Sequence, residues 1–477
     1  MSEEAFAKCG CERCGNHIEF PLEVAGASVA CPHCGGTTVL CPEQAEPALE
    51  AHTVSAAELA AACGPRLEAP PVSLLYKLGL VLVTVMMVLL PVLYLLLIVG
   101  AAAGVVYYAT HAYGLLSGRG NAFGRLVLYA APLLTGVCVV LFMIKPLFAR
   151  RAPGAQPLAL NPAVEPCLFA FISSICQAVG APMPARIDLD CQLNAAASFR
   201  RGFASLLSQD LVLTIGLPLA GALSVRELAG VIAHEFGHFT HGFAMRLSYI
   251  IRSIDFWFAR VVYERDAWDV TLEQWAEEAE DGRAALLIAC IRFGIWSSRL
   301  VLKLIMYSGH LVSCFLLRQM EYDADSYEIK VAGSDTFEAT MRRLHLLGRA
   351  LERSYEALKA SWVQKRQLPD HFPAFLLAQE AQLPRTLRAK LDDTIGLRRT
   401  GVFDTHPSDA DRIQRARQAS EPGRFQLEGP ATMLFQNFDA LARQVTMLHY
   451  TDDLRLPAVP GMVTRAGPGT GHGADLP

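Results

Sequence analysis

The longest hydrophobic stretches of this 477-residue chain are two runs without a charged side chain, at residues 78–118 and 126–144. Each run is long enough to cross about 30 Å of hydrocarbon as a helix. The pattern therefore predicts a transmembrane hairpin at 74–150, with two spans at about 78–99 and 126–146. The first run exceeds one straight crossing, so we expect its second half to continue as helix beyond the bilayer. The alternative is a turn back through the bilayer near Gly100.

After position 224, apolar residues recur at the spacing of one helix face. The sequence Ser-Val-Arg-Glu at 224–227 has the spacing of a capping box, in which serine and glutamate side chains satisfy free backbone donors of the first turn. Apolar residues then recur three and four positions apart. The sequence predicts a helix from about Ser224 to a stop at Gly242.

This helix carries two histidines four residues apart. His-Glu-Phe-Gly-His at 234–238 places both imidazoles, His234 and His238, on one face, where they can share a metal ion. Glu235 between them supplies a base. Zinc hydrolases use this combination, because zinc lowers the pKa of a bound water to about 7 and the carboxylate takes its proton. A metzincin-type site would need a third histidine at the position of Ala244 and is excluded.

The third zinc ligand must come from another part of the chain, and Glu321 is the best candidate. It follows an apolar run that should be helical, and Asp325 lies one turn further on the same face. Asp325 would accept a hydrogen bond from a zinc-binding histidine and fix its orientation. The alternative is that both carboxylates belong to a solvated acidic face. The histidine motif upstream favours the ligand interpretation.

Short strands are predicted at 186–190 and 211–215, in a chain that is otherwise mostly helical. The second strand directly precedes the zinc helix. An exposed edge strand at 210–215 would bind an extended substrate by adding it to the sheet. After Glu321 the chain is expected to be helical to about Gln367.

The insertion at 243–317 is predicted to be amphipathic or associated with the membrane. Four cationic side chains fall on one face of its apolar helix: Arg292, Arg299, Lys303 and His310. This stripe suits a bilayer surface. It would equally suit a polar seam against the catalytic domain, or a further membrane hairpin with residues 243–263.

Four cysteines near the amino terminus have the spacing of a zinc ribbon: Cys11, Cys14, Cys31 and Cys34. Glycines after each pair allow the tight turns that bring backbone amides to the sulfurs. Cys9 could replace Cys11, and redox-active pairs are the alternative. Thiolate zinc sites persist best in a reducing compartment, so we expect residues 1–41 to lie inside the cell. The ribbon would recruit a substrate or a partner protein.

Composition supports a membrane protein. Hydrophobic residues make up 52% of the chain, and the mean hydropathy is +0.29. A net charge of −4 gives no reason to expect a nucleic-acid partner. The remaining segments are predicted to be a linker with a short helix, a second linker, the catalytic domain and a disordered tail, at 42–73, 151–166, 167–456 and 457–477.

At residues 165–420 the chain resembles the membrane zinc metallopeptidases of family M48, a gluzincin-type fold. The resemblance rests on the His-Glu-Phe-Gly-His helix, the Glu321 and Asp325 motif, Thr-His-Pro-Ser at 405–408 and the segment that begins at Asn194. It implies that Asn194 and His406 lie beside the zinc and help to bind the substrate backbone or the developing oxyanion. It also implies a role in quality control of membrane proteins.

The sequence therefore predicts a membrane-anchored zinc endopeptidase that cleaves membrane or membrane-associated proteins, with Glu235 as general base. Basic residues beside the spans favour cytoplasmic termini and a cytoplasmic catalytic domain in a bacterial inner membrane. One catalytic and one structural Zn²⁺ are expected. The competing hypothesis is an inactive membrane scaffold that acts through its zinc ribbon.

Overall fold

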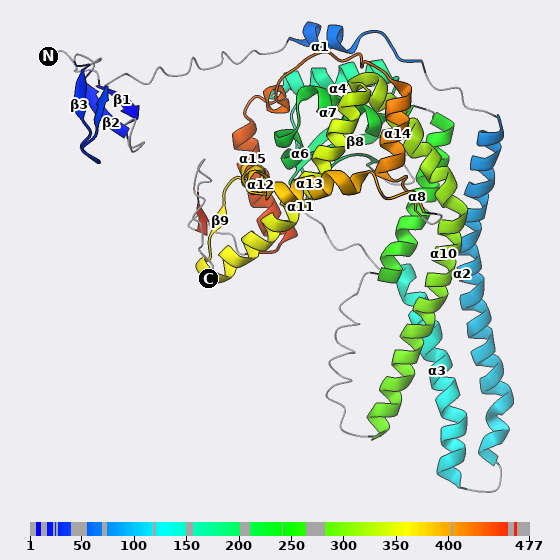
Figure 1. Ribbon diagram of the computed structural model, residues 1–477. Helices are drawn as coiled ribbons and strands as arrows, with labels where there is room; N and C mark the ends of the chain where they lie inside the picture. Colours follow the sequence, from blue (N-terminus) through cyan, green and yellow to red (C-terminus); the bar gives the residue numbers. More distant parts are fainter. Residues whose placement is uncertain are drawn as a thin grey trace. The chain divides into compact units, whose positions relative to one another are not determined.

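The computed structural model describes residues 6–10, 17–21, 24, 27–39, 55–68, 74–117, 121–148, 156–200, 210–240, 242–263, 282–401, 404–456 and 462–464. The chain divides into two compact units, Met1–Val54 and Ser55–Pro477. The mostly helical class predicted from the sequence, with a small sheet, is confirmed (Figure 1). The predicted tail lies almost wholly outside the described residues.

The first unit contains two antiparallel hairpins. Its strands are β1 (Phe6–Gly10), β2 (His17–Pro21), β3 (Ser28–Ala30) and β4 (Thr37–Val39). Cys31 and Cys34 lie in the turn between β3 and β4, where the His33 N–H donates to Cys31 Sγ at 3.4 Å. Gly35 has a φ of +70°, which favours glycine. The second predicted cysteine pair therefore lies in a tight turn.

The second unit holds the sheet and the remaining helices. The helices are α1 (Ala56–Cys63), α2 (Leu74–His111), α3 (Ala122–Phe148), α4 (Pro166–Val179), α6 (Leu217–Ala222), α7 (Val225–Gly237), α8 (Gly242–Tyr263), α10 (Gly282–Ala332), α11 (Ser334–Lys365), α12 (Phe372–Ala381), α13 (Arg385–Ile395), α14 (Asp409–Ala419) and α15 (Phe438–Leu448). Short 3-10 turns follow α2 and precede α15, and a π turn ends α15. Strands β9 (Leu368–Pro369) and β10 (Val463–Thr464) form a separate pair.

The four-stranded sheet has the order β5-β6-β8-β7. Its strands are β5 (Leu158–Ala159), β6 (Arg186–Asp190), β7 (Ala195–Phe199) and β8 (Leu211–Gly216). β6 and β8 are parallel, and β7 is antiparallel to β8. The two predicted strands are therefore present, but the prediction of an edge strand at 210–215 is wrong. β8 is buried between β6 and β7, because the alanine-rich segment at 195–199 pairs with it and forms the edge.

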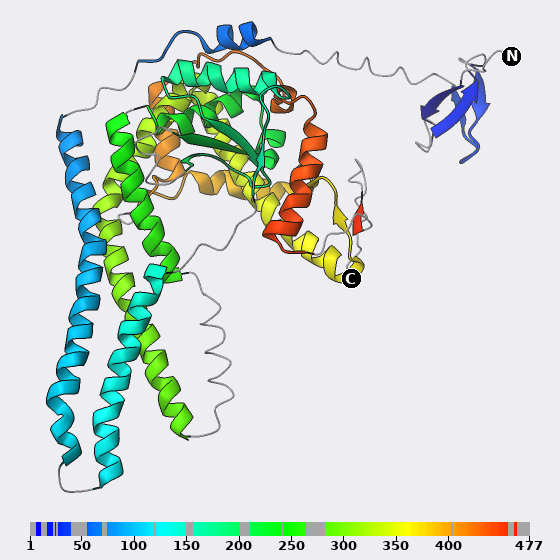
Figure 2. The same ribbon diagram turned by 180° about the vertical axis from the view of Figure 1, so that it is seen from behind.

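Helix α7, which carries the histidine motif, lies between this sheet and α10 (Figure 2). The predicted capping box is confirmed, since the Ser224 hydroxyl accepts from the Glu227 N–H and the Glu227 carboxylate accepts from the Ser224 N–H. The predicted stop at Gly242 is wrong. α7 ends at Gly237, whose carbonyl accepts from the Thr240 hydroxyl, and Gly242 begins α8.

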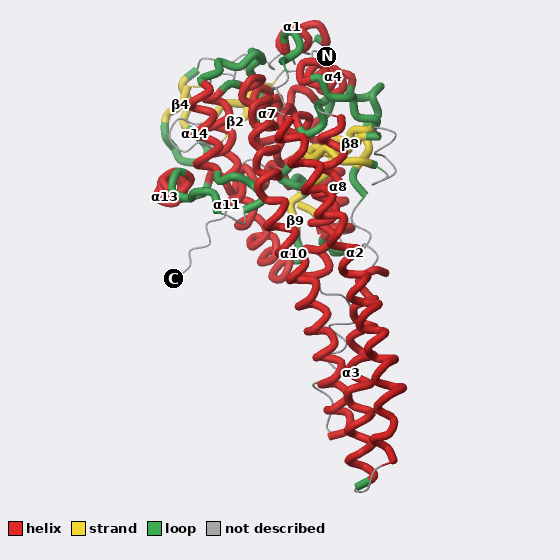
Figure 3. The backbone as a smooth tube through the Cα atoms, turned by 90° about the vertical axis from the view of Figure 1, so that its right-hand side faces the viewer, coloured by secondary structure: helices red, strands yellow, loops and turns green. Residues whose placement is uncertain are grey.

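Three described helices are long and apolar enough to cross a membrane, within Leu74–Ser117, Ala122–Lys145 and Ile291–Ala332. They lie side by side (Figures 1 and 3). The first runs to His111 as one helix. The third belongs to α10, so the predicted insertion contributes a candidate span that the two-span prediction did not include. α8 and the three helices share an apolar core whose members include Met87, Tyr94, Phe258, Leu302 and Met306.

A stripe of exposed apolar side chains follows α10 at intervals of three and four residues: Phe293, Trp296, Leu300, Leu304, Tyr307, Leu311 and Phe315. The stripe covers roughly 33 Å at 1.5 Å per residue, close to the thickness of a bilayer core. Of the predicted cationic stripe, Arg292 and Lys303 are exposed, whereas His310 turns toward Asp255 of α8 with 3.6 Å between Nδ1 and Oδ1. The predicted cationic stripe is therefore partly a polar contact between α10 and α8, made by His310.

The linker before α2 is partly docked on the second unit. α1 begins with its own capping box at Ser55 and packs against α4. The segment after it is held by its backbone, because the Leu67 N–H donates to the Ala178 carbonyl and Lys330 and Arg424 donate to the carbonyls of Glu68 and Pro65.

Close packing of α7 on α10 depends on two glycines. A Cβ at Gly230 would lie 2.8 Å from the Ala332 Cβ, and one at Gly237 would lie 3.0 Å from Tyr327 Cδ2. Both distances are shorter than normal contacts. The two helices can approach this closely because these positions lack side chains.

Replacing Gly230 by alanine should therefore lower stability by about 1–3 kcal/mol through overpacking. The matched control is Gly348→Ala in α11, where a Cβ would meet nothing within 4 Å. That change should stabilise by about 0.4–1 kcal/mol, because alanine restricts the unfolded chain. Unfolding temperatures in detergent would check both. Equal effects of the two substitutions would contradict the packing argument.

Candidate metal centre

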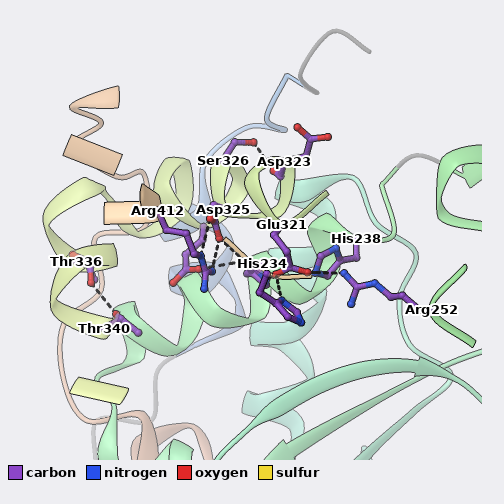
Figure 4. Close-up of polar contacts among 12 residues, drawn as sticks. His234, His238, Arg252, Glu321, Asp323, Asp325, Ser326, Thr336, Thr340 and Arg412 are labelled. Atoms are coloured by element: carbon purple, nitrogen blue, oxygen red, sulfur yellow. Dashed lines mark hydrogen bonds and ion pairs between the residues drawn. The ribbon is translucent and has the colours of Figure 1, made fainter. Parts of the chain in front are cut away.

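Two helices bring the predicted ligands together (Figure 4). α7 supplies His234, and His238 caps its C-terminal end; the two ring centroids lie 5.0 Å apart, with the rings nearly perpendicular. α10 supplies Glu321, which is 4% exposed. Its Oε2 lies 3.6 Å from His234 Nε2, and its Oε1 lies 3.7 Å from His238 Nε2. Residues more than eighty positions apart in the sequence thus converge on one point.

The donor set fits a divalent metal ion. One ligand atom from each of His234, His238 and Glu321 lies within 4.8 Å of the others. Two imidazoles and a carboxylate are the ligands of one class of catalytic zinc site, in which a fourth position stays open for water or substrate. These side chains are buried or half-buried, so they would bind the ion without extensive competition from bulk water.

Glu235 lies between the ligands and the sheet. Its Oε2 accepts a hydrogen bond from the Ala197 N–H of β7 at 3.4 Å. The backbone groups of residues 194, 196, 198 and 200 point toward β8. The bonds from the Gly216 N–H to the Asn194 carbonyl and from the Arg200 N–H to the Asp210 carbonyl set this alternation. The N–H of Ala197 therefore points to the free edge of the sheet. The edge strand and the proposed base are in direct contact.

Behind His234 lies a buried acidic cluster. His234 Nδ1 is 3.1 Å from Asp325 Oδ1 and 3.5 Å from Glu328 Oε2. Arg412 of α14 neutralises Asp325 through two bonds, from Nε at 2.9 Å and from Nη2 at 2.5 Å. The predicted position of Asp325 behind a ligating histidine is the one the structure has. Glu328 was not predicted, although it follows Glu321 by two helical turns on the same face.

His406 and Asn194 differ in how closely the structure ties them to this centre. His406 Nδ1 lies 3.4 Å from Glu321 Oε2, and its side chain is 65% exposed. Two residues later, Ser408 caps the start of α14. This helix places Arg412 beside Asp325. Asn194 is exposed just before β7, and its carbonyl accepts from the Gly216 N–H. Its predicted role at the metal stays a prediction.

Burial and charge give the three motif residues different proton affinities. Burial opposes a charged His234 ring, but Asp325 and Glu321 outweigh burial and hold its pKa well above the usual value. Burial, together with the Arg252 cation, lowers the pKa of His238 to about 3, so this ring is neutral. Burial also raises the pKa of Glu235, which brings a carboxylate closer to the range useful for proton transfer.

Arg252 of α8 contacts the centre and, like Glu328, was not predicted from the sequence. Its Nη2 donates to Glu321 Oε1 at 2.6 Å. Sequence spacing gave no signal for it, since the contact joins residues on different helices.

The fold and this centre define a membrane metallopeptidase, in which a two-histidine helix faces a glutamate on a second helix. Comparison with known proteins agrees: residues 166–420 match the model of peptidase family M48, and the chain belongs to that family. It is similar to Protease HtpX of Acinetobacter baylyi, with 25% identity over 297 residues, or 61% of this chain and 84% of that protein. The same figures hold for Protease HtpX of Acinetobacter baumannii strain AYE. No solved structure matches the chain.

The predicted structural zinc site is only partly within the described residues. Cys31 is buried and Cys34 is exposed in the β3–β4 turn, whereas Cys11 and Cys14 lie outside the described residues. The zinc ribbon therefore stays a prediction.

Removing the Arg412 guanidinium should destabilise the centre. Arg412→Met leaves Asp325 buried without its cation, which costs about 3–5 kcal/mol for a broken buried pair. The matched control is Arg417→Met on the same helix, because Arg417 is 63% exposed where it pairs with Glu338. The unfolding temperature should drop clearly for Arg412→Met and stay nearly unchanged for Arg417→Met. Similar values for both would show that the Asp325 pair does not hold the structure together.

Proposed function

We propose that this protein is a zinc-dependent endopeptidase that hydrolyses peptide bonds in membrane or membrane-associated proteins. The convergence of His234, His238 and Glu321 around one point, with Glu235 beside them, carries the proposal. A zinc ion held by the three ligands would polarise a water molecule and lower its pKa to about 7.

The side chains around the ligands would transfer the proton, orient His234 and stabilise the charge that develops on the substrate. Glu235 would accept a proton from the attacking water and deliver it to the leaving amine. Its half-buried position against the Ala197 N–H limits its rotation. Asp325 and Glu328 would hold the His234 ring through Nδ1, which leaves Nε2 for the metal. His406 is exposed at the rim of the site and would donate to the oxyanion that develops on the substrate.

Substrate would bind along β7. This strand is an edge of the sheet, and the odd-numbered residues from Ala195 to Phe199 direct their backbone groups away from β8. An extended peptide would add to this edge by backbone pairing. It would then run past Glu235, which already accepts a hydrogen bond from Ala197 of the same edge. Asn194, at the start of β7, would contact the substrate backbone.

The membrane helices support membrane substrates. α10 carries both the exposed apolar stripe, which ends at Phe315, and the ligand Glu321. The two lie about one and a half turns apart, or roughly 9 Å along the helix axis. The site therefore stands just beyond the end of a lipid-facing surface.

The location and biological role rest on the sequence. We propose a cytoplasmic catalytic domain in a bacterial inner membrane, which protease protection of oriented vesicles would check. Docking of α1 on α4 is consistent with the amino-terminal segment and the catalytic domain lying on one side. The resemblance to the HtpX branch supports quality control of membrane proteins. An inactive scaffold is the competing function.

Glu235→Gln should separate the enzyme from the scaffold. The substitution keeps the size of the side chain but removes the base, so cleavage of an unfolded membrane protein should fall by about 10²–10⁴-fold or more. Zinc content should be unchanged, because Glu235 is not among the ligands. Glu352→Gln, on an exposed part of α11, is the control and should cleave normally. Chelator-insensitive cleavage, or full activity of Glu235→Gln, would contradict the proposed mechanism.

Zinc counting should separate the two predicted ions. The full chain should hold about two zinc ions, and Cys31→Ser combined with Cys34→Ser should remove the ribbon zinc alone. His238→Ala should remove the other. Elemental analysis of the purified proteins measures this directly. One zinc ion in the parent that survives the cysteine substitutions would refute the ribbon but keep the catalytic site.

A further inference from the structure

The two oxygens of Glu321 have different surroundings. Oε2 faces His234 Nε2 and His406 Nδ1, at 3.6 and 3.4 Å. Oε1 lies 3.7 Å from His238 Nε2 and accepts the bond from Arg252 Nη2 at 2.6 Å. That distance is at the short end for a charge-assisted hydrogen bond, so the guanidinium is a strong partner for this oxygen. Figure 4 shows Arg252 beside Glu321 and Arg412 beside Asp325, so the two arginines approach the centre from opposite sides.

We propose that Arg252 is a positioning residue that holds Glu321 as a one-oxygen ligand of the metal. The inference rests on the proposed zinc site and adds a determinant of its coordination. Each oxygen lies near one imidazole, but only Oε1 is bound by the guanidinium, so Oε2 is the oxygen left free to bind the metal. A carboxylate that bound through both oxygens would occupy an additional coordination position. Arg252 thereby preserves the position that water or substrate must take.

A second contact between the same two helices fixes the direction of Arg252. Asp255 follows it by one turn on α8, and Asp255 Oδ2 accepts from the buried Ser313 hydroxyl of α10 at 2.9 Å. Ser313 precedes Glu321 by about two turns, so both contacts lie along one seam between α8 and α10. Phe258, also on α8, is buried in the apolar core that these helices share. The guanidinium therefore comes from a helix whose rotation is set by its own packing.

The arrangement also explains why an arginine stands beside a centre that binds a cation. Its charge repels the metal, but it offsets part of the negative charge of Glu321 and of the carboxylates behind His234. The planar guanidinium forms a directed bond, which an ammonium group cannot reproduce with the same geometry. Partners that orient a metal-binding side chain typically change metal affinity by about 10–100-fold when they are removed.

Metal affinity and coordination test the proposal without relying on activity. The full chain with Cys31→Ser and Cys34→Ser serves as the parent, so that only the catalytic site is titrated. Zinc affinity is measured by competition with a chelator, and the visible spectrum of the Co²⁺ form reports four-coordinate against five-coordinate metal. Arg252→Met should weaken zinc binding by about 10–100-fold and shift the Co²⁺ spectrum toward the weaker absorption of five-coordinate metal. Arg349→Met, which removes an exposed arginine of α11, should change neither.

The outcomes separate this inference from the proposed function. A parent that binds no zinc refutes the proposed function itself. A parent that binds zinc, with equal or tighter binding and an unchanged Co²⁺ spectrum in Arg252→Met, overturns the positioning role. If Arg252→Met does not fold, Arg252→Lys replaces it. The lysine is shorter and lacks the planar fork, so it should weaken zinc binding about tenfold, and unchanged affinity again overturns the proposal.

Discussion

The close crossing of α7 and α10 is the contact on which the centre depends. The two histidines of α7 and Glu321 of α10 face one another only because Gly230 and Gly237 let the helices approach until side chains of one touch the backbone of the other. The same crossing buries Asp325 and Glu328 behind His234. Burial of so many ionisable groups is costly unless each is paired, and Arg412 and Arg252 supply cations from α14 and α8. The chemistry of the site and its stability therefore come from one set of contacts.

A single helix joins this crossing to the membrane. α10 has 51 residues, or about 75 Å of continuous helix, and passes from the exposed apolar stripe to Glu321 without a break. α8 packs on both α2 and α10 and brings Arg252 to the same carboxylate. Two of the elements that shape the centre are thus also elements of the apolar bundle.

The sequence predicted the parts of the site that depend on spacing along one helix. The two histidines, the capping box at Ser224 and the pair of carboxylates at Glu321 and Asp325 follow from helical periodicity, and the structure places all of them as expected. The pairing of Glu321 with the two histidines rested on the histidine motif upstream and then on the family resemblance, because local pattern carries no information on which helices meet.

The errors have the same origin. The edge strand was assigned to residues 210–215, since the alanine-rich segment at 195–199 lacks the branched residues typical of strands, although tertiary pairing makes it the edge. α7 ends at Gly237, five residues before the predicted stop, where the Thr240 hydroxyl donates to the Gly237 carbonyl, and the sequence pattern did not show this. Arg252 went unnoticed because its partner lies on another helix. The apolar part of α10 was predicted to be amphipathic or membrane-associated, with a further membrane hairpin as an alternative, and its cationic side chains drew weight away from a third span.

X-ray absorption at the zinc edge tests the central claim most directly. The measurement uses the full chain with Cys31 and Cys34 replaced by serine, so that thiolate zinc does not contribute. The account predicts two imidazole nitrogens at about 2.0–2.1 Å and oxygen ligands at about 2.0–2.2 Å. A zinc environment with sulfur or with fewer than two imidazoles, or protein that retains no zinc, would contradict it.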